Sequence, residues 1–161
     1  MRPGVRATLS SAAAVTATAL VGGVGTTAGS RWYRKLDKPS WQPPPEAFGP
    51  VWTSLYVLLA YAGARAYVQT RGTERQRFVR VFGTNLALNA GWTWLFFRLR
   101  RPDLALVGIG ALNASNVALL RQAWDADRSA GVAVAPYVAW TAFATALNSE
   151  IVRRNPKAIA R

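Results

Sequence analysis

The sequence predicts an all-α membrane protein: a five-transmembrane-helix bundle with a Pro/Trp-rich lid loop between helices 1 and 2. Three observations lead to this fold class. Half of the 161 residues are hydrophobic, only 17% are charged, and the charges leave five long stretches untouched. Each stretch holds 17 to 24 residues, close to the roughly 20 residues of helix that cross a bilayer core. The stretches are 7–30, 47–64, 81–97, 104–120 and 130–149.

We therefore expect a single integral membrane domain over residues 1–161, with helices at about 7–29, 48–69, 78–98, 103–124 and 130–153. For the first helix, a secretory signal peptide is the alternative, because basic residues precede an apolar run there. For the other four, the alternative is a soluble bundle. A soluble bundle would need each helix to carry a polar face at helical period, and those stretches show no such face.

The loop after the first helix is rich in aromatic residues and proline. Five of the nine prolines lie between residues 39 and 50. Proline fixes φ and disfavours helix at the residue before it, so we expect an extended, stiff segment that folds over one end of the bundle as a lid. Trp32, Tyr33 and Trp41 are its aromatic residues. Pro50 would then sit in the first turn of the second helix, where its missing N–H costs nothing.

Aromatic and amide side chains share helical faces on the second, third and fifth helices. Tryptophan is frequent, with seven in the chain, and an aromatic belt at the membrane interface is one explanation. Amides inside a membrane helix face the bundle interior, either to join helices by hydrogen bonds or to line a cavity. A pocket with flat aromatic walls would suit a large planar apolar ligand. The residues at one-turn spacing are Trp52 and Tyr56; Asn85, Asn89 and Trp92; and Trp140, Ala144 and Asn148, with Leu147 beside them.

Small residues repeat every four positions on the third helix, at Gly83, Ala87 and Gly91. The fourth helix has a similar repeat that begins at Gly110. Such seams allow helices to approach closely, either within one chain or between two copies. We take the Gly83–Gly91 face as the candidate surface of a homodimer.

Composition excludes several kinds of chemistry. The chain has no cysteine and no histidine, which excludes disulfides, thiolate zinc sites, cysteine nucleophiles and histidine-based triads. We expect no metal site and no required cofactor. The net charge of +13 comes from clusters between the apolar stretches, so membrane lipids, not nucleic acid, are the expected partners.

Four blocks of sequence together resemble the TspO/MBR family of tryptophan-rich sensory proteins, relatives of the mitochondrial translocator protein. The first block begins Trp-Tyr-x-x-Leu-x-Lys-Pro-x-Trp-x-Pro-Pro, and the second is Phe-Gly-Pro-Val-Trp-Thr-x-Leu-Tyr. The third contains Leu-Ala-Leu-Asn-x-x-Trp, and the fourth begins Pro-Tyr-x-x-Trp. They occupy residues 32–44, 48–56, 86–97 and 136–148.

The resemblance implies a dimer of five-helix protomers, each with a ligand pocket beneath the first loop. Family members bind porphyrins, notably protoporphyrin IX, and some bind cholesterol. Trp32, Tyr33 and Trp41 match the loop that closes over the pocket. The family's cholesterol motif has a tyrosine where this chain has Ser149, which makes cholesterol a doubtful partner. The positions that match the family pocket are Trp52, Asn89, Trp92, Trp140, Ala144 and Leu147.

These observations favour a membrane receptor or sensor that binds a metal-free porphyrin. One alternative is a light- and oxygen-dependent enzyme that degrades the porphyrin, with Trp52 and Trp140 as electron donors. A second alternative is a transporter of tetrapyrroles or lipids, although no carboxylate lies in mid-membrane to couple transport. We expect a multi-pass protein of a bacterial cytoplasmic membrane, because an excess of arginine over lysine is typical of proteins from GC-rich bacterial genomes. The alternative is a eukaryotic source, which would imply the mitochondrial outer membrane.

Overall fold

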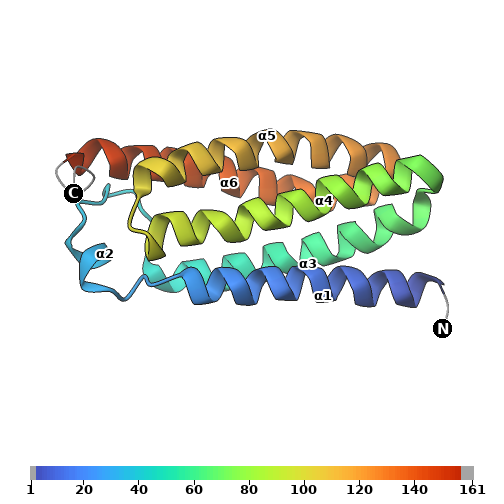
Figure 1. Ribbon diagram of the computed structural model, residues 1–161, viewed down its shortest axis with the longest axis horizontal. Helices are drawn as coiled ribbons and strands as arrows, with labels where there is room; N and C mark the ends of the chain where they lie inside the picture. The colour runs from blue at the N-terminus through green and yellow to red at the C-terminus, as the bar shows by residue number, and fades with distance from the viewer. Residues whose placement is uncertain (1–2, 157–161) are drawn as a thin grey trace.

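The structure is a computed structural model that describes residues 3–156. Every regular element within that range is helical, and the long helices lie side by side along one axis (Figure 1). Pro102 and Pro45 each occupy a first helical position, where proline is favoured. The elements are α1 (Pro3–Gly25), α2 (Arg31–Lys35), α3 (Pro45–Gln69), α4 (Gly72–Thr93), the π-helical segment η1 (Trp94–Arg98), α5 (Pro102–Ala126) and α6 (Arg128–Arg154).

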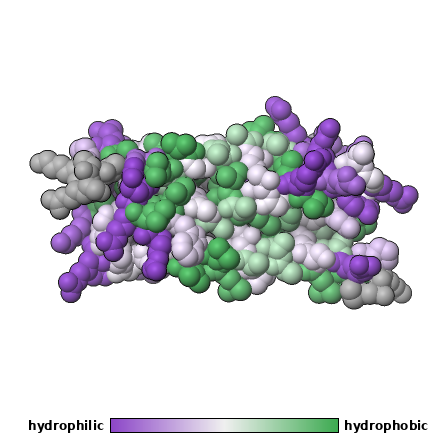
Figure 2. All heavy atoms as spheres, in the orientation of Figure 1, coloured by the Kyte–Doolittle hydropathy of each residue, from purple (hydrophilic) through white to green (hydrophobic). Residues whose placement is uncertain are grey.

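The face of the bundle shown in Figure 2 has the character of a membrane protein. Hydrophobic residues gather in its middle, and hydrophilic residues gather at both ends. Helices α1, α3, α5 and α6 have mean hydropathies between 1.2 and 1.5 over 18-residue windows, which is enough to cross a membrane. The prediction of an all-helical, multi-pass membrane protein is thereby confirmed. Helix α4 does not reach that hydropathy, so the fifth crossing stays a prediction.

The helix ends differ from the predicted ones by a few residues. Helix α1 ends at Gly25 instead of residue 29. Its last turn is rich in glycine, and two threonines follow it. Helix α4 begins at Gly72 instead of residue 78. Its first two turns contain Glu74 and several arginines, which are good helix formers. An uncharged stretch therefore marks only the part of a helix that suits lipid. The helix itself is longer, because it continues into the charged sequence beside that stretch.

The loop after α1 is less extended than predicted. Residues 31–35 form the short helix α2, whose N-cap is Ser30: its hydroxyl accepts the backbone N–H of Tyr33. The prediction for Pro50 was wrong, because α3 begins five residues earlier, at Pro45. Pro50 lies inside the helix, where it lacks the N–H that would bond to the preceding turn.

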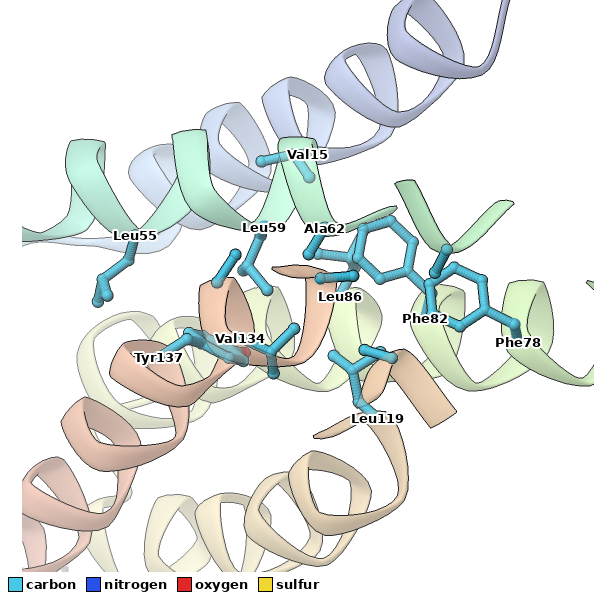
Figure 3. Packing of buried hydrophobic residues seen from close by; sticks show 14 residues of the cluster. Val15, Leu55, Leu59, Ala62, Phe78, Phe82, Leu86, Leu119, Val134 and Tyr137 are labelled. Carbon is cyan, nitrogen blue, oxygen red and sulfur yellow. The ribbon is translucent and has the colours of Figure 1, made fainter. Parts of the chain in front are cut away.

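One hydrophobic cluster joins all five long helices, as Figure 3 shows. Leu59 of α3, Leu119 of α5 and Tyr137 of α6 are fully buried in it. Helices α1 and α3 approach closely beside this cluster, where the Ser11 hydroxyl donates to the Ala60 carbonyl at 2.8 Å. The seam between them depends on small residues at the contact.

A polar seam connects α4, α5 and α6 inside the apolar bundle. The Asn85 amide donates to Asn116 at 2.6 Å, and the Asn116 amide donates to Thr141 at 2.7 Å. The Asn113 amide donates to Thr145, also at 2.7 Å. These three asparagines therefore join helices and do not line a cavity. Such bonds hold a membrane bundle in one packing arrangement, because lipid offers amides no other partner.

Candidate functional site: an aromatic cavity beneath the first loop

A cavity of about 700 Å³ lies at the end of the bundle that carries α2 and the proline-rich loop. Its volume is within the usual range for small-molecule sites. Helices α2, α3, α4 and α6, the η1 segment, the residues that follow α1 and the proline-rich loop all contribute to its wall. The site thus depends on segments that are distant in sequence.

Large aromatic side chains form the walls on α3 and α6. Trp52 and Phe48 face the cavity from α3, and Trp140 and Phe143 face it from α6. The rings support one another: Phe48 meets Trp140 edge-on at 5.9 Å between centroids, and Trp140 lies 5.3 Å from Phe143. These four rings provide flat, apolar contact area with little freedom to move.

Trp92 is held in place by a hydrogen bond at the cavity wall. Its indole N–H donates to the side-chain oxygen of Asn148 at 3.1 Å, and the Asn148 amide donates to the Pro102 carbonyl at 2.8 Å. Asn148 is buried and joins α4, α5 and α6 through these two bonds. The orientation of the Trp92 ring therefore depends on Asn148.

The other predicted pocket residues divide into two groups. Ala144 and Leu147 lie at the wall, next to the aromatic rings of α6. Asn89 does not belong to the lining. It is 2% exposed, and its side-chain oxygen accepts the Tyr56 hydroxyl at 2.9 Å. It joins α3 to α4 one turn from Trp92.

The three aromatic residues of the loop have different surroundings. Tyr33 lies at the cavity wall, where burial raises the pKa of its hydroxyl and a hydrogen bond from Gln42 partly offsets that rise. Trp32 packs edge-on against Phe96, outside the lining. Trp41 contacts Phe143 edge-on at 5.8 Å and is 48% exposed.

Two basic residues lie at the rim of the cavity. Lys38 donates from Nζ to the carbonyls of Tyr33 and Leu36, each at 2.9 Å, and Arg34 donates to the Gly29 carbonyl. These acceptors are neutral, so both side chains keep a net positive charge. Neither forms an ion pair with a carboxylate among residues 3–156.

The cavity also contains groups that sequence reasoning missed. The segment just after α1 contributes Thr26, and η1 contributes Phe97. Gln42 lies at the wall as well, and its Oε1 atom is buried without a hydrogen-bond partner in the described part of the chain. No periodicity could indicate these residues, because they lie outside the regular helical faces. Across residues 3–156, no group of three His, Cys, Asp or Glu side chains is arranged to hold a metal ion.

The candidate dimer face is open in the protomer. Gly83 and Ala87 are exposed on α4. Within residues 3–156, a methyl group added at Gly83 or Gly91 would have no neighbour within 4 Å beyond the backbone of its own helix. Packing within the protomer therefore does not account for the small residues at these positions.

Fold and site together define a class: a multi-pass helical membrane protein with a tryptophan-lined cavity beneath a proline-rich loop. The chain belongs to the TspO/MBR family, whose family model matches residues 11–154. It is 34% identical to the translocator protein of Homo sapiens over 129 residues, which is 79% of this chain and 76% of the human protein.

Bacterial relatives are similar to the same extent. The tryptophan-rich sensory protein of Cereibacter sphaeroides is 36% identical over 124 residues, 77% of each chain. Protein CrtK of Rhodobacter capsulatus is 34% identical over 130 residues, 78% of this chain and 79% of the relative. The resemblance seen in four sequence blocks thus extends through most of the chain.

Proposed function

We propose that the protein is a membrane receptor or sensor that binds a metal-free porphyrin, of the protoporphyrin IX type, in the cavity beneath the first loop. The observation that carries this proposal is the pair Trp52 and Trp140 on the walls of a 700 Å³ cavity with a basic rim. A tetrapyrrole complements both features. Its wide apolar plane matches the indole walls, and the carboxylates on one edge match the basic rim.

The chemistry of the lining fits each part of such a ligand. The ring plane would stack on the indoles and gain about 25 cal/mol for each Å² of apolar surface removed from water. The carboxylates would meet Arg34 and Lys38 at the rim. The unpartnered Oε1 of Gln42 could accept a pyrrole N–H. A chain without histidine or cysteine lacks the usual axial ligands for haem, which favours the metal-free ring.

We further propose that α2 and the loop between α2 and α3 together act as a lid. Tyr33 and Gln42 line the cavity from this segment, so a ligand that contacts them would favour the closed state over the open one. A change in these two populations is a signal that a second protein could detect. This is how binding would become sensing.

The membrane arrangement belongs to the same proposal. We propose that α4 and η1 form the fifth crossing, because residues 81–97 carry no charge. Two protomers would associate through Gly83, Ala87 and Gly91. The proposed location is a bacterial cytoplasmic membrane, and Ser149 in place of the family's tyrosine makes cholesterol a doubtful ligand.

Titration of the purified protein with protoporphyrin IX in the dark, followed by tryptophan fluorescence, tests the proposal. Saturable quenching is expected. Trp52→Phe and Trp140→Phe should each weaken binding, whereas Trp124→Phe should leave it unchanged, because Trp124 is 45% exposed and lies outside the lining. Equal affinities in all four proteins, or no saturable binding at micromolar ligand, would contradict the proposal.

Illumination of the same samples tests a second candidate, oxidative degradation of the bound porphyrin. Two electron-rich indoles lie at the cavity wall, and this placement favours the candidate. Light-excited porphyrin could react with oxygen beside these indoles, so that the porphyrin ring is oxidised. A new absorbing product that needs light and both tryptophans would identify an enzyme. Porphyrin movement across sealed vesicles would identify a transporter instead.

A further inference from the structure

A second cavity lies at the opposite end of the bundle, between α1, α3 and α4. Its volume is about 450 Å³, and it shares no lining residue with the aromatic cavity. Arg6 and Arg75 line one part of it, and Phe78 and Phe82 line another. Charge and apolar surface thus meet in one cavity that the proposed function does not use.

Arg75 is held in a fixed position at this cavity. Its Nε donates to the Thr70 carbonyl at 2.9 Å, and its guanidinium lies 4.5 Å from the centre of the Tyr67 ring. Both partners are neutral, so the positive charge of Arg75 is not compensated. Neither Arg75 nor Arg6 forms an ion pair with a carboxylate within residues 3–156. Two arginines at one cavity without a counter-charge favour an anionic group.

The apolar part of the cavity consists of stacked rings and small residues. Phe78 and Phe82 lie one turn apart on α4 (Figure 3), with ring centres 5.7 Å apart and ring planes within 14°. Gly63 of α3 packs directly against the Phe82 ring, and Ala14 of α1 lines the cavity beside it. Ala14 is exposed on the surface of the bundle, so the cavity is open on the side where lipid chains would lie.

We propose that this cavity binds one anionic phospholipid, with the phosphate on Arg6 and Arg75 and an acyl chain along Val79 and Phe82, over the buried Phe78. The argument is complementarity of charge and polarity. Arg6 and Arg75 lie in the first turns of α1 and α4, and Phe78 and Phe82 lie further along α4, toward the middle of the bundle, as headgroup and chain do in a bilayer. A soluble anion would match the arginines but would leave the apolar part empty.

Native mass spectrometry of the full-length protein in detergent tests this site. Dioleoyl phosphatidylglycerol should be retained, and dioleoyl phosphatidylcholine should be lost, because the latter has no net charge. Arg6→Gln and Arg75→Gln should each weaken phosphatidylglycerol binding about fivefold, the effect of one basic residue near a lipid headgroup. Arg77→Gln removes the same charge from α4 outside the lining and should change nothing.

A fourth variant, Ala14→Trp, fills the apolar part without changing the charge. It should displace the lipid although both arginines remain. Equal retention of the two lipids would contradict the proposal, and so would unchanged phosphatidylglycerol binding in Ala14→Trp and both arginine variants. Either result would mean that lipid associates with the protein surface non-specifically. Displacement of the lipid by millimolar inorganic phosphate would overturn the proposal too. Porphyrin binding is measured at the other cavity. A failure of the lipid proposal would therefore leave the porphyrin proposal unaffected, and the reverse also holds.

Discussion

Asn155 and Asp37 exchange two hydrogen bonds that fasten the first loop to the end of α6. The Asp37 backbone N–H donates to the Asn155 side-chain oxygen at 2.9 Å, and the Asn155 amide donates to the Asp37 carbonyl at 2.8 Å. The two residues are 118 positions apart in the chain. Because α2 and the proline-rich segment lie on either side of Asp37, this pair controls how firmly the loop covers the aromatic cavity.

Loss of the Asn155 amide should open the loop. In Asn155→Ala both bonds disappear, and hydrogen bonds of this kind contribute about 0.5–1.5 kcal/mol each. We expect faster association and faster release of protoporphyrin IX, measured by stopped-flow fluorescence, with little change in thermal stability. Arg153→Ala is the control, since Arg153 pairs with Glu150 and has no hydrogen bond to the loop. Unchanged rates in Asn155→Ala would show that the loop is held by other contacts.

Asn148 should affect both stability and ligand affinity. Asn148→Leu leaves the Trp92 N–H without its partner and removes the bond to the Pro102 carbonyl, and a donor left unsatisfied costs about 1–3 kcal/mol. Thermal unfolding in detergent should shift to lower temperature, and porphyrin affinity should fall because the Trp92 ring loses its fixed orientation. Ser149→Ala, which only removes a bond to the preceding turn of α6, should behave as the wild type.

Asp127, between α5 and α6, should make stability sensitive to acid. The Ser129 hydroxyl, the Ala130 N–H and Arg65 hold the pKa of this carboxyl well below its usual range. The group is charged in both states above its unfolded pKa of about 3.9, where its contribution to stability is complete. As pH falls below that value, the unfolded state binds a proton first, and the contribution is progressively lost.

The expected result is a thermal midpoint that falls between about pH 5 and about pH 3 and is less dependent on pH in Asp127→Asn. The variant should also be less stable at neutral pH, because the amide cannot replace the ion pair with Arg65. Asp125→Asn, two residues earlier on the exposed end of α5, is the matched control. Identical pH profiles for all three proteins would rule out Asp127 as the source.

Charge patterning could locate the helices because a bilayer requires long uncharged segments, and all five predicted helices correspond to long helices in the structure. Periodicity could place Asn89 and Trp92 on one face, but it could not show how deep each residue lies. Trp92 reaches the cavity, while Asn89 is bonded to Tyr56 behind it. The bonds between Asp37 and Asn155 leave no local signal, since a contact over such a separation depends on the whole fold.

Two glycines should respond in opposite ways to added side chains. A Cβ at Gly63 would lie 2.3 Å from the Ser11 hydroxyl and 2.8 Å from the Phe82 ring, so Gly63→Ala should lower stability by about 1–3 kcal/mol, as overpacked cores do. A Cβ at Gly83 has no neighbour within 4 Å, and Gly83→Ala should stabilise the protomer slightly through helix propensity. Thermal unfolding of the two variants measures both effects, and a stable Gly63→Ala would show that α1 and α3 can move apart.

Larger side chains at the open glycines test the proposed dimer. Gly83→Leu and Gly91→Leu should convert dimer to monomer, observed by light scattering in detergent, because the bulk would separate the two α4 helices. Gly110→Leu is the matched control: it is exposed on α5 and also has no neighbour within 4 Å. Each protomer should keep its thermal midpoint and its porphyrin binding, since the cavity lies within one chain. Monomer formation by the α5 variant but not by the α4 variants would move the interface to α5.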